Sequence, residues 1–145
     1  MRTDRYGALR QGPILERLVV DLCSNVMDPI HYGRLFLAGD AASLISPSAA
    51  KGANLAIMEA EVLAKGLIAS LRQDDERPLA RYSAECVPRI WRAQEFSQWM
   101  INLLHTPFGS SDEAAFMRAL QRVRLGSLQN SHSHQDFFAE NYVGI

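Results

Sequence analysis

The chain has 145 residues, of which 48% are hydrophobic and 21% charged, and its formal net charge is −1. These values are ordinary for one globular domain, and the nearly neutral charge gives no basis for binding nucleic acid or an anionic membrane. No apolar run is long enough to cross a bilayer, and the first residues lack the apolar core of a secretory signal, so the sequence predicts a cytoplasmic protein.

The first third of the chain is predicted to contain short strands. Leu18–Leu22 is an apolar, β-branched run, and a second strand is expected at Val26–Met27, stopped by Asp28-Pro29. Tyr32-Gly33 is expected to turn the chain into a further strand at Leu35–Ala38. Cys23 in this region and the distant Cys86 have no spacing that favours a disulfide or a metal, so both are expected to be free thiols, with Cys86 buried on a helix.

Three helices are predicted after these strands. The first runs from about Gly52 to Leu71, with apolar residues at 57, 60, 64, 67, 68 and 71 on one face. The second runs from about Pro78 to His105, with a kink expected at Pro88. The third lies near 112–123 and is capped by Ser110 or Ser111, and residues 129–135 are expected to be loop.

These elements predict an α+β, mostly α chain with no sign of a second domain. Residues 1–50 hold the strands and a loop segment, and residues 51–145 are helical. His132 and His134 have a spacing that could hold a metal, but no third ligand is near them in the sequence, so no metal site is predicted.

The candidate site lies between the strands and the first helix. Leu35–Ala38 ends in Gly39-Asp40, where a glycine lets a ligand approach the backbone and the carboxylate of Asp40 can accept hydrogen bonds from a polyol. From the residue type alone, Asp40 would more often be a turn or capping aspartate. The segment Lys51-Gly52-Ala53-Asn54 then opens a helix, whose free N–H groups favour negative charge.

The segment Gly33–Asn54 resembles the second flavin-binding segment of the flavin-dependent aromatic hydroxylases. The resemblance covers most of the chain, from Gly12-Pro13 onward, and the sequence Ala-Glu-Asn-Tyr-Val-Gly at Ala139–Gly144 narrows it to enzymes of the 4-hydroxybenzoate type. It implies FAD as cofactor, a small aromatic substrate, and NADPH or NADH as reductant. Cys23 stands where the family has an arginine associated with the nicotinamide cofactor, so the choice of reductant stays open.

The resemblance also implies roles for individual residues. Asp40 would hold the ribityl chain, and the helix start would face the pyrimidine edge of the flavin. The carbonyl of Pro47 would lie near the substrate phenol, and Tyr142 would relay the phenolic proton. Without the resemblance, Pro47 would be interpreted as an ordinary loop proline and Tyr142 as an aromatic residue of the core. The residues expected to contact the cofactor are Gly39, Asp40, Lys51, Gly52, Ala53 and Asn54.

The Gly-x-Gly-x-x-Gly turn that holds the ADP half of FAD in this family is not found in the 145 residues. The chain is therefore expected to be the C-terminal portion of a hydroxylase. Two alternatives stay open: a truncated, non-catalytic helical remnant, or one half of a split flavoprotein. The helices in 78–123 resemble the part through which the family pairs its subunits, which predicts a homo-oligomer or a chain that lacks its N-terminal half.

Overall fold

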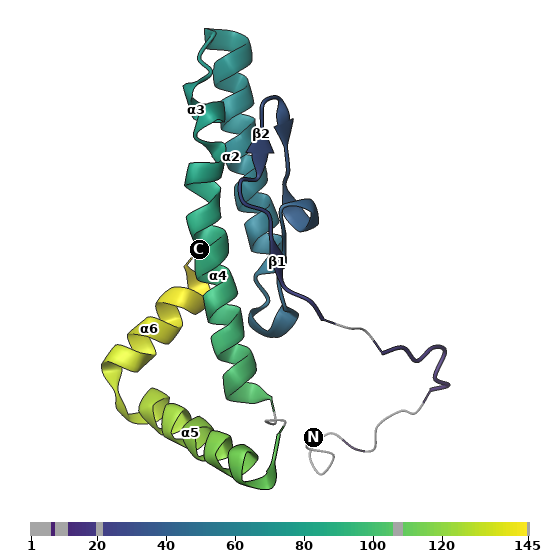
Figure 1. The fold of residues 1–145 in the computed structure, drawn as a ribbon, viewed down its shortest axis with the longest axis vertical. Coiled ribbons are helices and arrows are strands. Elements are labelled where there is room, and N and C mark those ends of the chain that lie inside the picture. The colour runs from purple at the N-terminus through teal and green to yellow at the C-terminus, as the bar shows by residue number, and fades with distance from the viewer. Residues whose placement is uncertain (1–6, 8–11, 20–21, 106–108, 145) are drawn as a thin grey trace.

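The protein is described by a computed structural model that covers residues 7, 12–19, 22–105 and 109–144. Two 3₁₀ turns, η1 (Gly39–Ala41) and η2 (Pro47–Ala49), precede the first long helix. Figure 1 shows α2 and α4 side by side along the long axis, with the strands against α2 and the C-terminal end returning to α4. The helices are α2 (Gly52–Gln73), α3 (Arg77–Ala80), α4 (Tyr82–Leu104), α5 (Ser111–Asn130) and α6 (His132–Val143).

The strands are short and form two antiparallel pairs. They are β1 (Asn25–Val26) with β4 (Ser43–Leu44), and β2 (His31–Tyr32) with β3 (Leu35–Phe36). The predicted turn after Tyr32 is confirmed, and Gly33 takes the left-handed φ of 56° that this turn requires. The predicted strand at 35–38 is shorter in the structure: β3 ends at Phe36, although the Leu37 N–H still donates to the Ile30 carbonyl at 2.9 Å.

The predicted strand at Leu18–Leu22 is wrong for the residues that the structure describes. Leu18, Val19 and Leu22 lie outside any strand and are exposed, while residues 20–21 lie outside the described part. A strand needs a neighbour that accepts and donates its backbone hydrogen bonds, and no described segment pairs with this run.

The first predicted helix is confirmed, with two further residues at its end. The C-cap residue Asp74 takes a left-handed φ of 53° and its N–H donates to the Ala69 carbonyl. Gly66 lets α2 pack closely on α3, since a Cβ at this position would lie 2.7 Å from Cδ2 of Leu79.

The second predicted helix is divided by a single residue. The N–H of Arg81 donates to the carbonyls of both Arg77 and Pro78, so the chain tightens between α3 and α4. Pro78 lies in the first turn of α3, where its missing N–H costs little. α4 continues through Pro88 to Leu104.

The third helix is longer than predicted, and the loop expected at 129–135 is wrong. Ser110 caps α5 by accepting the Glu113 N–H at 3.3 Å, but α5 continues to Asn130, and α6 begins after Ser131 alone. The side chain of Gln135 explains the tight junction, because its Nε2 donates to the carbonyl of Leu128 at 2.9 Å at the open end of α5.

The core has two parts. A small cluster lies beneath η2 and joins Ala49, Phe96 and Met100 to Trp99 and to Phe138 of α6. Cys86 is buried and Cys23 is exposed, in coil rather than strand, and both are free thiols. The main cluster joins the strand region to α2 and α4 through Ile30, Ala42, Leu55, Met58, Tyr82, Cys86, Ile90 and Ala93.

Within the described part of the chain, no helix has both the length and the apolar content that crossing a bilayer would need.

Candidate functional site

The Gly39–Asp40 turn is built on a left-handed glycine. Gly39 has φ of 61°, and its carbonyl accepts the N–H of Ala42 at 2.9 Å, which closes η1. An added Cβ would meet the Ala56 Cβ at 3.6 Å, an ordinary contact, so the backbone angle rather than lack of space favours glycine here. Asp40 follows directly and is exposed, so its carboxylate is open to a ligand.

A buried carboxyl group that the sequence analysis did not single out holds the backbone of this turn. The Gly39 N–H donates to Oε2 of Glu59 at 2.6 Å, and Glu59 has no exposed surface. Burial raises the pKa of Glu59, although the hydrogen bond from Gly39 acts in the opposite direction. The signal was present in the sequence, since Glu59 follows Leu55 by four residues on the face that α2 buries.

The turn packs on α2 through Ala56 and Glu59, which follow the first residues of that helix. The N–H of Leu55 is the first to find a helical partner, the carbonyl of Lys51 at 3.0 Å. The N–H groups of Gly52, Ala53 and Asn54 therefore belong to the unsatisfied first turn, and no side chain caps it. Ala53 and Asn54 are exposed, which leaves this end of the helix accessible to an anion or a polar ligand edge.

Lys51 connects the helix start to the C-terminal end of the chain. Its side chain is buried, and Nζ donates to the carbonyl of Tyr142 at 2.5 Å while lying 5.8 Å from the centre of the Tyr142 ring. Burial, and next the nearby charge of Arg92, lower the pKa of Lys51. The prediction placed Lys51 at the flavin, and in the structure its ammonium group donates to the end of α6.

Tyr142 is half exposed, and its ring stacks on Phe138 with centroids 5.3 Å apart. Arg92 of α4 holds the preceding residue, since its Nε donates to Oδ1 of Asn141 at 3.0 Å. The phenol of Tyr142 is thus presented from an anchored helix end.

Pro47 begins η2, in a loop that α4 anchors. The hydroxyl of Ser97 donates to the Ser46 carbonyl at 2.9 Å, and Nε2 of Gln94 donates to the Leu44 carbonyl at 2.7 Å. The Pro47 carbonyl accepts the Ala50 N–H at 2.9 Å, which leaves one lone pair for a further donor.

The predicted residues fall into two groups: the Gly39–Asp40 turn, and the set formed by Lys51, Pro47 and Tyr142. Both groups lie against α2 or α4. Lys51 and Tyr142 are in direct contact, and the Pro47 loop and α6 share the cluster around Phe96. The structure brings Lys51, the Pro47 loop and Tyr142 together near the start of α2, and it places the Gly39–Asp40 turn against Ala56 and Glu59 of the same helix. The predicted roles of all these residues stay predictions.

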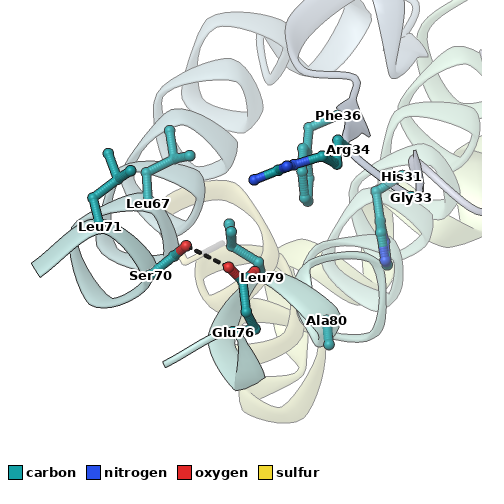
Figure 2. Close-up of a pocket in the computed structure, with 10 residues that line it drawn as sticks. All are labelled: His31, Gly33, Arg34, Phe36, Leu67, Ser70, Leu71, Glu76, Leu79 and Ala80. Carbon is teal, nitrogen blue, oxygen red and sulfur yellow. Dashed lines mark hydrogen bonds between the residues drawn. The ribbon is translucent and has the colours of Figure 1, made fainter. Parts of the chain in front are cut away.

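A separate cavity of about 330 Å³ lies beside the β2–β3 hairpin and contains none of the predicted residues. Figure 2 shows Arg34 extending toward Leu67, opposite a hydrogen bond of 2.7 Å from Ser70 to Glu76. Among the described residues, no three metal-binding side chains gather at one place.

Residues 7–97 match the protein family described as FAD binding domain. The p-hydroxybenzoate hydroxylase of Acinetobacter baylyi is 39% identical over 134 residues, which cover 92% of this chain and 32% of that protein. YetM of Bacillus subtilis, named as a candidate FAD-dependent monooxygenase, is 37% identical over 76 residues, or 52% of this chain and 20% of YetM. The FAD-dependent monooxygenase penM of Penicillium crustosum is 33% identical over 86 residues, or 53% of this chain and 18% of penM.

The chain thus spans about a third or less of the length of these curated relatives. The family match nevertheless covers more than half of the chain, and the first relative aligns with nearly all of it. The chain belongs to the FAD binding domain family and, within it, to the FAD-dependent aromatic hydroxylases.

Proposed function

We propose that this chain supplies flavin-facing and substrate-facing residues to an FAD-dependent monooxygenase. The reaction is hydroxylation of a phenolic aromatic acid, such as 4-hydroxybenzoate, with NAD(P)H and oxygen. The observation that carries the proposal is the Gly39–Asp40 turn, which is held on α2 through Ala56 and Glu59 and exposes a carboxylate, together with the uncapped start of the same helix. The identity of 39% to p-hydroxybenzoate hydroxylase supports the substrate class.

On the cofactor side, FAD when bound supplies the redox chemistry by accepting hydride equivalents and activating oxygen. Asp40 accepts hydrogen bonds from hydroxyls of the ribityl chain. The N–H groups of Gly52, Ala53 and Asn54, with the positive end of the α2 dipole, favour negative charge on the ring edge that faces them. The buried ammonium of Lys51 adds positive potential at the same helix end.

On the substrate side, two groups handle the phenolic proton. The free lone pair of the Pro47 carbonyl accepts a hydrogen bond from the phenol, which orients it. When the phenol O–H turns from this carbonyl to the Tyr142 hydroxyl, Tyr142 takes that proton and passes its own to water, which its half-exposed ring allows, so it carries no charge. Loss of this proton makes the aromatic ring more electron-rich, which is what electrophilic hydroxylation requires.

A test of the cofactor assignment needs only this chain and FAD. Saturation-transfer difference NMR detects weak ligands, which matters because the Gly-x-Gly-x-x-Gly segment that holds the ADP half is not found in this sequence. Asp40→Ala should weaken FAD binding roughly tenfold or more, because a hydrogen bond to a charged group contributes about 1.5–3 kcal/mol. Asp40→Asn should weaken it less, since the amide oxygen still accepts.

The matched control is Asp136→Ala, which removes an exposed carboxylate from α6. It should leave FAD binding unchanged. If Asp40→Ala and Asp136→Ala bind FAD alike, the ribityl assignment is rejected. A parent chain that gives no saturation transfer at all would favour the alternative of a helical remnant without cofactor.

A further inference from the structure

Glu59 is an unusual residue for the position that it occupies. It lies in the middle of α2 on the buried face of the helix, with no exposed surface. Among the described residues, only its Oε2 has a hydrogen-bond partner, and the buried Oε1 has none. A buried oxygen without a partner costs stability, so an apolar side chain would pack here at lower cost. A carboxyl at this position therefore needs a reason other than packing.

The partner of Glu59 supplies that reason. Its Oε2 accepts the N–H of Gly39 at 2.6 Å, across 20 residues of sequence. Gly39 has the left-handed φ of 61°, a conformation that glycine also leaves easily, since it has few steric restraints. A second helix holds the chain just before the turn, because the Tyr82 hydroxyl donates to the Leu37 carbonyl at 2.9 Å. Side chains from α2 and α4 thus fix the backbone on both sides of Ala38.

We propose that Glu59 is a positioning residue: its carboxyl holds the Gly39 amide so that the turn presents the Asp40 carboxylate to its ligand. The inference rests on the proposed function, because it takes the ribityl chain of the flavin as that ligand. Glu59 acts through the backbone and does not touch the ligand. Fixing the turn before binding lowers the entropy that ligand binding must otherwise overcome.

The first arm of the test uses no flavin. Hydrogen exchange of the Gly39 amide is measured by NMR in the parent, in Glu59→Gln, which keeps an acceptor oxygen, and in Glu59→Leu, which keeps only similar bulk. We expect the Gly39 amide to be protected in the parent and in the Gln variant. In the Leu variant its protection should fall roughly tenfold to a hundredfold, the equivalent of one hydrogen bond to a charged group. The amides of α2 should be unchanged.

The parent alone can overturn the contact, so the test does not depend on every variant folding. A Gly39 amide that exchanges in the parent as fast as an exposed amide rejects the proposal. Equal protection in the parent and in a folded Glu59→Leu variant rejects it as well.

The second arm measures FAD by saturation-transfer difference NMR in the same proteins and in Asp40→Ala. FAD binding should be weaker in Glu59→Leu than in the parent, and close to the parent in Glu59→Gln. Combining Glu59→Leu with Asp40→Ala should weaken binding no further than Asp40→Ala alone, because both substitutions remove the same interaction, that of Asp40 with FAD. If Glu59→Leu frees the Gly39 amide but leaves FAD binding intact, while Asp40→Ala weakens it, the positioning role is overturned. If Asp40→Ala itself has no effect, the proposed function fails and the Glu59–Gly39 contact remains.

Discussion

Ser97→Ala removes the hydroxyl that ties the Pro47 loop to α4. Ser97 is 1% exposed, and its Oγ donates to the carbonyl of Ser46, a residue that is itself 4% exposed. The substitution therefore leaves a carbonyl without its donor in a place that water reaches poorly. Such an unsatisfied group costs about 1–3 kcal/mol. Alanine recovers about 0.5 kcal/mol of helix propensity, so we expect a net loss of roughly 0.5–2.5 kcal/mol.

Ser127→Ala is the matched control, because the same atoms are deleted from another helix. The hydroxyl of Ser127 donates to the Val123 carbonyl at 3.0 Å, one turn back in α5. That carbonyl keeps its helical backbone donor, so nothing is orphaned, and helix propensity should make the change neutral or stabilising by about 0.5 kcal/mol. Urea unfolding followed by circular dichroism gives both free energies. If the two substitutions change the unfolding free energy equally, the Ser97–Ser46 bond does not anchor the loop.

Two further predictions concern α2. Gly66→Ala should destabilise by up to about 2 kcal/mol in urea unfolding, because crowding against Leu79 costs about 1–3 kcal/mol and helix propensity returns about 1. Gly126→Ala, which meets nothing within 4 Å, should instead stabilise by about 0.5–1 kcal/mol, and the same sign for both would contradict the packing argument. Burial raises the pKa of Glu59 above 4.5, so the parent should lose stability as pH rises from 4.5 through that raised value. The Glu59→Gln variant has no such titrating group, so its free energy of unfolding relative to the parent should increase as pH rises, by at most about 1.4 kcal/mol per pH unit. A difference in unfolding free energy that does not depend on pH would show that Glu59 does not titrate in the folded protein.

The sequence predicts α2 well because two independent signals agree there. Apolar residues recur at helical spacing, and polar residues around Asp74 mark the end of the helix. The spacing does not identify the buried face, because positions 57, 60, 64, 67, 68 and 71 are all exposed and α2 buries Leu55, Met58, Glu59 and Gly66 instead. The prediction of a loop at 129–135 fails because composition was the only signal. A polar stretch forms helix when its side chains satisfy the backbone, as Gln135 does for the end of α5. Likewise Leu18–Leu22 has the composition of a strand, yet a strand also needs a partner, which composition does not report.

Charged residues show the same limit more sharply at the candidate site. The sequence predicts Asp40 and the start of α2 from their order along the chain. It does not distinguish Glu59, which is buried, from Glu61, which is exposed and pairs with Lys65 at 2.5 Å. Helical spacing places Glu59 beside Leu55 but does not show that this face is the buried one, and the group that makes its burial tolerable, the Gly39 N–H, comes from a segment 20 residues away. Such a partner is known only once the fold is known.

The contact between Lys51 and Tyr142 joins residues 91 positions apart, and it has a consequence for how the site is assembled. Burying an ammonium is costly unless it is hydrogen-bonded, and the Lys51 ammonium donates to a backbone carbonyl at the end of α6. If α6 leaves α4, Lys51 loses that partner and is free to reach water, so the helix start loses its fixed positive charge. Docking of α6 thus places two things at once: the Tyr142 phenol and the ammonium beside the first turn of α2. In the proposed function these serve the substrate and the flavin respectively, so one helix end prepares both sides of the site.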